Sequence, residues 1–174
     1  MKINCLLLFL LTSLVISCSS DSDDDNSKED SIVGVWQAYE LKVNNDTASD
    51  DEKNARDLLA FLSAKKCYVL SFDFKEDLTV IIENSVQYLE IGLNSKGNGF
   101  DIPCPTEKDT ETTVYVYADG KLTYTDEDQQ EISVDITIDG DVMTLDAADL
   151  DIPNLNAGGS LSLRENKTLA ISYS

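Results

Sequence analysis

The fold is decided most clearly by residues 132–139, which read ISVDITID. Apolar β-branched residues alternate there with serine, threonine and aspartate. A period of two places every apolar side chain on one face of a β-strand and every polar one on the other. Such a strand is typical of an antiparallel sheet that packs one face on a core and exposes the other to water.

The same alternation recurs along the chain between short turns. Further strands are expected at residues 33–43, 68–74, 78–82, 86–93, 113–117, 122–125, 142–145, 161–163 and 169–173. Because closure removes the exposed edges of so many short strands, the pattern predicts a mainly β fold, an antiparallel sheet closed into a barrel. Which side chains of residues 33–43 point inward is left undecided, since both faces of this segment carry apolar groups.

One segment between the first two strands has helical spacing instead. Ser49 and Glu52 form the sequence of a capping box. An apolar stripe follows at Ala55, Leu58, Leu59 and Leu62, and the segment closes with Lys65 and Lys66. We expect one short amphipathic helix there, with its stripe in the core.

The N-terminus has the pattern of an export signal. Lys2 precedes the apolar residues 6–16, a run too short to cross a bilayer, which needs roughly 17–25 residues. The stretch Val15-Ile16-Ser17-Cys18 resembles a bacterial lipobox. That resemblance implies removal of residues 1–17 and acylation of Cys18, which would anchor the chain stably in a membrane through more than one acyl chain. The alternative is an ordinary secreted protein.

An acidic tract separates this cysteine from the rest. Residues 18–30 hold six acidic side chains, one lysine and no large apolar residue after Cys18, so we expect a solvated tether. The acids also resemble a signal for export to the surface of some Gram-negative bacteria, although they can equally be a spacer. The prediction is a protein of the outer membrane or cell surface, with one domain at residues 31–174.

Composition narrows the possible activities. The formal net charge is −20, which disfavours nucleic acid as a partner. The chain has no histidine, so the usual Ser-His-Asp, Cys-His and zinc-hydrolase sites are excluded. We therefore expect no enzymatic activity, no catalytic or metal-binding residues, and no cofactor.

Two of the four cysteines remain in the mature domain. Cys5 leaves with the signal peptide and Cys18 carries lipid, which leaves Cys67 and Cys104. In an oxidising compartment we expect these two to form a disulfide. A two-cysteine metal site is the alternative, and it lacks histidine partners.

A family resemblance begins at residues 32–41, IVGVWQAYEL. The motif Gly34-x-Trp36 resembles the start of lipocalin-like bacterial lipoproteins, and Cys67, Phe72, Phe74 and Cys104 extend the resemblance over residues 31–173. It implies an antiparallel up-and-down, lipocalin-like barrel in which Trp36 closes one end and Gly34 permits close backbone approach. It also suggests Arg164 as a basic residue over the tryptophan. The T-D-Y element of classical lipocalins is missing.

Two functions follow from this resemblance. In the first, the barrel is a calyx that binds or carries a small apolar ligand. In the second, side chains fill the barrel and the protein acts through its outer surface on a partner. The expected inward residues can line a pocket or fill it: Tyr68, Leu70, Phe72, Phe74, Leu122 and Tyr124.

Overall fold

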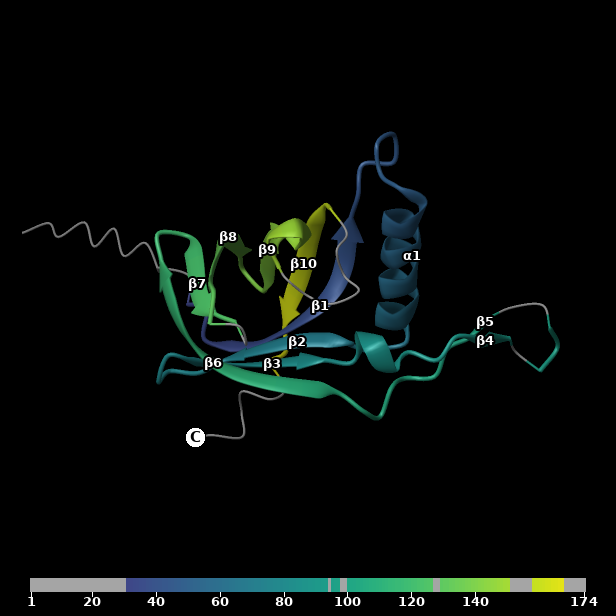
Figure 1. Ribbon diagram of the computed structural model, residues 1–174, viewed down its shortest axis with the longest axis horizontal. Helices are drawn as coiled ribbons and strands as arrows, with labels where there is room; N and C mark the ends of the chain where they lie inside the picture. Colours follow the sequence, from purple (N-terminus) through teal and green to yellow (C-terminus); the bar gives the residue numbers. More distant parts are fainter. Residues whose placement is uncertain (1–30, 94, 98–99, 127–128, 151–157, 168–174) are drawn as a thin grey trace, which may run out of the picture.

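Eight antiparallel strands form a closed barrel in the computed structural model, which describes residues 31–93, 95–97, 100–126, 129–150 and 158–167 (Figure 1). The strands are β1 (Gly34–Lys42), β2 (Leu70–Phe74), β3 (Thr79–Asn84), β6 (Asp109–Ala118), β7 (Lys121–Thr125), β8 (Glu131–Asp139), β9 (Val142–Asp146) and β10 (Ser160–Glu165). Each pairs with its neighbours along the chain, and β1 closes the barrel against β10. The predicted up-and-down barrel is confirmed.

A β-bulge determines which side chains of β1 point inward. Ala38 pairs with Leu163 and Glu40 pairs with Ser162, so Tyr39 is an extra residue without a partner in the ladder. Trp36 and Ala38 are buried before the bulge, and Leu41 is buried after it. A strictly alternating strand would turn Leu41 outward, because it lies three residues after Ala38. The bulge therefore brings it back into the core.

The one α-helix of the described residues lies between the first two barrel strands, as predicted. It is α1 (Asp50–Ala64), and it packs beside β1 (Figure 1). Leu59 and Leu62 are buried, and Ala55 and Leu58 are partly buried against the same core. The capping box is confirmed: Oγ of Ser49 accepts from the Glu52 N–H at 3.2 Å, and a Glu52 carboxylate oxygen accepts from the Ser49 N–H at 2.6 Å.

Removing this cap should weaken the helix. We expect Ser49→Ala to lower the free energy of unfolding by about 1 kcal/mol, because the Glu52 N–H at the helix start loses its partner. Urea denaturation followed by circular dichroism measures the loss. Thr47→Ala is the matched control, since that side chain is exposed just before the helix. An equal loss in both variants would contradict the role of the cap.

The strand predicted at residues 86–93 is wrong. The chain instead forms a short helix, η1 (Val86–Tyr88), and then β4 (Gly92–Leu93). Within the described ranges, β4 pairs with β5 (Phe100–Asp101) alone. A local bond accompanies this change: Oδ1 of Asn84 accepts from the Val86 N–H at 2.9 Å and forms an Asx turn just before η1. The hairpin β4–β5 projects away from the barrel beyond α1 (Figure 1).

Several predictions concern segments outside the described residues. They are the signal peptide, Cys18 and the tether at residues 1–30, and the strand at residues 169–173. In the part of the chain that is described, no helix has the length and apolar character needed to cross a membrane.

Candidate functional site

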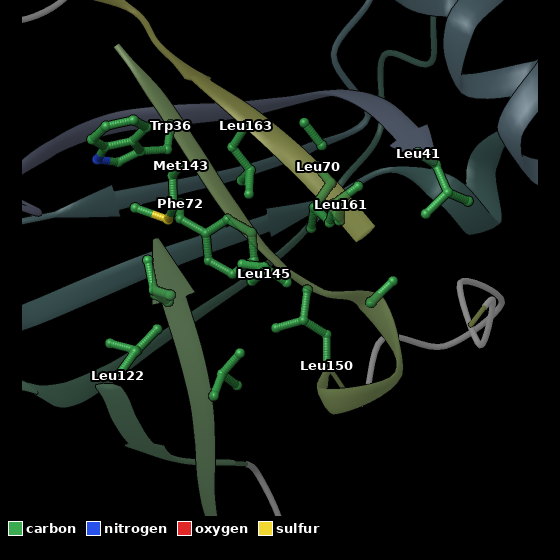
Figure 2. Close-up of a cluster of buried hydrophobic side chains, with 14 of the residues drawn as sticks. Trp36, Leu41, Leu70, Phe72, Leu122, Met143, Leu145, Leu150, Leu161 and Leu163 are labelled. Carbon is green, nitrogen blue, oxygen red and sulfur yellow. The ribbon is translucent and has the colours of Figure 1, made fainter. Parts of the chain in front are cut away.

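The inward side chains of the barrel pack against one another. Figure 2 shows a group of them pointing into the space that the strands enclose. Those that are fully buried come from β1, β2, β3, β8, β9 and β10: Trp36, Leu70, Phe74, Val80, Val134, Met143, Leu161 and Leu163, each at most 1% exposed. A cavity large enough for a ligand would leave water-accessible area on its walls. These residues have almost none.

Side chains also fill both ends of this core. Trp36, near the start of β1, donates its Nε1–H to the carbonyl oxygen of Ile32 at 2.7 Å. At the opposite end, the short helix η2 (Ala147–Asp149) follows β9, and both Ala147 and Leu150 are buried in the same cluster. The core therefore reaches from the tryptophan to the residues around η2.

The aromatic residues beside Trp36 are locked by specific contacts. The rings of Phe74 and Tyr115 meet edge to face with centroids 5.0 Å apart. The Tyr115 hydroxyl donates to the carbonyl oxygen of Lys75 at 3.0 Å. Burial raises the pKa of Tyr115, so this hydroxyl stays a donor at neutral pH. This packing gives the interior a fixed shape.

The two residues of the G-x-W motif lie where β1 begins. Gly34 has a φ of 143°, a conformation that side chains with a Cβ rarely adopt. It pairs with Phe74, and a Cβ at this position would lie 3.4 Å from a carboxylate oxygen of Glu165. The motif thus lies at the start of β1, where this strand enters the sheet between its two neighbouring strands.

The position suggested for Arg164 is wrong. Its guanidinium lies over the ring of Tyr39, 4.4 Å from the centroid, on an exposed side chain of β10. Arg164 pairs with Gln37 across the strands, whereas the residue opposite Trp36 is Glu165. Alternation therefore directs Arg164 outward, and the bulged Tyr39 becomes its aromatic partner.

Tyr68 also differs from its expected inward position. It is 40% exposed, whereas Leu70, Phe72, Phe74, Leu122 and Tyr124 are buried as predicted. Strand β2 begins only at Leu70, so Tyr68 belongs to the preceding segment, where Lys66 has a φ of 59°. The alternation of β2 does not reach back that far.

The predicted disulfide is confirmed between Cys67 and Cys104. It joins the segment after α1 to the segment after β5. A second contact lies beside it, where Nζ of Lys65 donates to the carbonyl oxygen of Ile102 at 2.7 Å. Ile102 is buried in the core cluster, and Cys104 is exposed. Together these contacts fix the chain that returns from the hairpin.

A hollow of about 460 Å³ lies at the base of the hairpin. It is lined by Gln87, Tyr88, Leu89, Glu90, Pro103, Cys104, Pro105, Thr106 and Glu107. One wall comes from η1 and the residues after it, and the other from the segment that the disulfide holds. Prolines, a leucine and a tyrosine give apolar surface, and two glutamates bring charge.

The charged side chains that line this hollow, Glu90 and Glu107, are both acidic. The Tyr88 hydroxyl donates to a carboxylate oxygen of Asp109 at 2.8 Å. This bond, with the nearby charges of Asp109 and Glu107, raises the pKa of Tyr88. Among the described residues, neither Glu90 nor Glu107 forms an ion pair. A cationic group of a ligand would therefore find carboxylates here that have no ion-pair partner among the described residues.

A second hollow, of about 290 Å³, lies between the end of β1 and α1. Its Arg56 already binds Asp57 at 2.8 Å and Asn45, and Lys42 pairs with Glu40 at 3.4 Å. Because the charges that line it are paired within the chain, this hollow offers less to a ligand than the first.

The sequence analysis identified residues that determine the fold, but it did not predict the residues that line the hollow. It identified Gly34, Trp36, Cys67 and Cys104, and the structure brings only Cys104 to the hollow. The prolines on both sides of Cys104 were the available signal for a wall there. In the described ranges, no three or more cysteine or acidic side chains are grouped so that they could hold a metal ion.

Comparison with known proteins adds no identification: no protein-family model matches the sequence, and the searches of curated proteins and of solved structures found no match.

Proposed function

We propose that the chain is a lipid-anchored protein of the cell envelope, located at the outer membrane or cell surface, whose filled barrel supports an outer binding surface. The packing of the inward side chains carries this proposal. A carrier of apolar ligands needs a pocket of roughly 300–1,000 Å³ that buries most of its ligand. The fully buried inward residues, each at most 1% exposed, leave almost no accessible area beside them for one.

The sequence of the N-terminus supports the anchor. A lipobox-like stretch ends at Cys18, and the acidic residues that follow would hold the domain away from the membrane. The lack of histidine supports a binding role over an enzymatic one. The small apolar ligand implied by the lipocalin resemblance is the alternative, and the packed core weighs against it.

Mass spectrometry of the protein extracted from its own membrane tests both parts. Under denaturing conditions we expect a chain that begins at Cys18 and carries added acyl mass, and this mass should be lost in Cys18→Ser. Under native conditions we expect no co-purifying apolar molecule beyond those acyl groups. A chain without acyl mass would overturn the anchor. A stoichiometric bound lipid or pigment would overturn the filled barrel.

A further inference from the structure

The larger hollow has the size of a small-molecule site. Its volume of about 460 Å³ lies within the roughly 300–1,000 Å³ that such sites span. Residues 87–90 line one side of it and residues 103–107 line the other. Each of these two segments carries one glutamate, Glu90 in the first and Glu107 in the second. A ligand in the hollow would therefore have a carboxylate available from each side.

These two carboxylates are not neutralised within the described chain. Neither Glu90 nor Glu107 forms an ion pair with a described residue. Lys108 follows Glu107 directly, but its ammonium group pairs with Glu83 on β3 instead. The nearest basic residue in the sequence is thus engaged elsewhere, and both glutamates can bind a cation that enters the hollow.

Aromatic and aliphatic groups line the hollow beside the carboxylates. Tyr88 supplies an aromatic ring, a group that attracts cations, and Pro103 and Pro105 supply aliphatic carbon. The Tyr88 hydroxyl donates to Asp109 at 2.8 Å, and Asp109 also accepts from the side-chain amide of Gln87. Asp109 is therefore occupied, and its bond fixes the position of the ring.

This lining suits an organic cation better than a metal ion. Two free carboxylates are few for Ca²⁺, which takes roughly six to eight oxygen ligands. The methylene groups of an aliphatic amine, in contrast, pack on apolar surface while its ammonium group binds a carboxylate, as a lysine side chain does.

Both sides of the hollow are fixed to the barrel. Leu89 packs on the core from the first segment. The second segment follows buried Ile102, and its Cys104 is joined by the disulfide to buried Cys67. Because these segments are already ordered, a ligand that binds between them loses less entropy than it would on mobile loops.

We propose that the hollow binds a small aliphatic dication, an unbranched amine with one ammonium group for Glu90 and one for Glu107. This inference rests on the proposed function, since it names the ligand of the outer surface that the filled barrel supports. Each ammonium group donates to one carboxylate, and the methylene stem lies against Tyr88 and the prolines. A single positive charge leaves one carboxylate without a partner, so a diamine should bind more tightly than a monoamine.

Nuclear magnetic resonance titrations of the isotope-labelled full chain, in non-ionic detergent at physiological ionic strength, test this proposal. The probes are the unbranched diamines from butanediamine to decanediamine, with hexylamine and Mg²⁺ for comparison. We expect saturable shifts of the amides that line the hollow, and one diamine length that binds best. Hexylamine lacks one ammonium–carboxylate contact and should bind about five-fold more weakly than the best diamine. Mg²⁺ lacks the stem and should show no preference for the hollow.

Single charge-removing variants separate this site from general attraction to an acidic protein. Glu90→Gln and Glu107→Gln should each weaken the best diamine by about five-fold, to the affinity of hexylamine. Glu131→Gln removes an exposed charge at the start of β8 and is the matched control, with an expected change of less than about two-fold. These glutamates are all exposed, so each variant should keep the amide spectrum of the folded chain.

Four results would overturn the proposal: shifts that do not saturate, equal affinity for every diamine length, binding of hexylamine or Mg²⁺ in the hollow as tight as that of the diamines, or an equal loss in Glu131→Gln. A capped dilysine peptide that binds more tightly than every diamine would also overturn it, in favour of lysine side chains of a partner protein. Absence of diamine binding, with an empty barrel in native mass spectrometry, removes this site and leaves the proposed function. An apolar ligand inside the barrel removes the proposed function itself, whether or not a diamine binds.

Discussion

Replacing Trp36 with alanine is expected to lower the free energy of unfolding by about 3–5 kcal/mol. The side chain is 1% exposed, so its removal leaves a cavity in the packed end of the barrel. The carbonyl oxygen of Ile32 also loses the Nε1–H that lies 2.7 Å away. Domains of this size are stable by only about 5–15 kcal/mol, so the loss is a large share of the total.

Urea unfolding followed by circular dichroism is the suitable measurement, because Trp36 is the single tryptophan and its fluorescence disappears with the substitution. Trp36→Phe retains much of the volume and should cost less. Val116→Ala, on a side chain that is 61% exposed, should change the stability by less than about 0.5 kcal/mol. A loss below about 1 kcal/mol in Trp36→Ala would show that the tryptophan does not hold this end of the core together.

Removing the disulfide with Cys67→Ala/Cys104→Ala should cost about 4 kcal/mol. The bond closes a loop with a sequence separation of 37, and its loss frees that loop in the unfolded chain. The melting temperature should fall by about 10 °C. Thermal melts of the double variant, and of the unchanged chain with and without a reductant, measure this effect.

Lys65→Met is the control for the second contact that holds the segment after β5. It removes the hydrogen bond from Nζ to the carbonyl oxygen of Ile102, and it should cost only about 1 kcal/mol. Limited proteolysis separates the two roles further. The disulfide variant should be cut faster between residues 90 and 101, because one leg of the hairpin loses its covalent attachment. Equal cutting rates in all three proteins would contradict the role of the disulfide in fixing the hairpin.

The barrel could be predicted because its strands repeat a simple pattern. In β8, Val134 and Ile136 are buried, with exposed residues between them, as the alternation requires. The hairpin turn at Asp119-Gly120 was equally readable, since both residues adopt positive φ and connect β6 to β7. The capping box at Ser49 fixed the start of α1. Each of these signals depends on residues that are close in the sequence, and each corresponds to the element that the structure contains at that position.

The remaining features depend on contacts that a local pattern does not contain. The bulge at Tyr39 follows from pairing with β10, far along the chain, and it decides that Leu41 points inward. Residues 86–93 are apolar enough for a strand, but an Asx turn at Asn84 leads the chain into η1 instead. The hollow needs two segments, residues 87–90 and 103–107, which the pairing of β3 with β6 and the bond between Tyr88 and Asp109 bring together. Its residues were therefore not predicted.

The pairing of β1 with β10 sets the order in which the barrel can be completed. Trp36 pairs with Glu165, so the seam joins the beginning of the domain to its end. A chain that leaves the ribosome N-terminus first holds β1 without one of its partners until almost the whole domain has emerged. Neighbouring hairpins such as β6–β7 and β8–β9 need no such wait, because their contacts are close in sequence. We therefore expect the seam to form last, and a truncated chain that lacks β10 to expose the edge of β1 to aggregation.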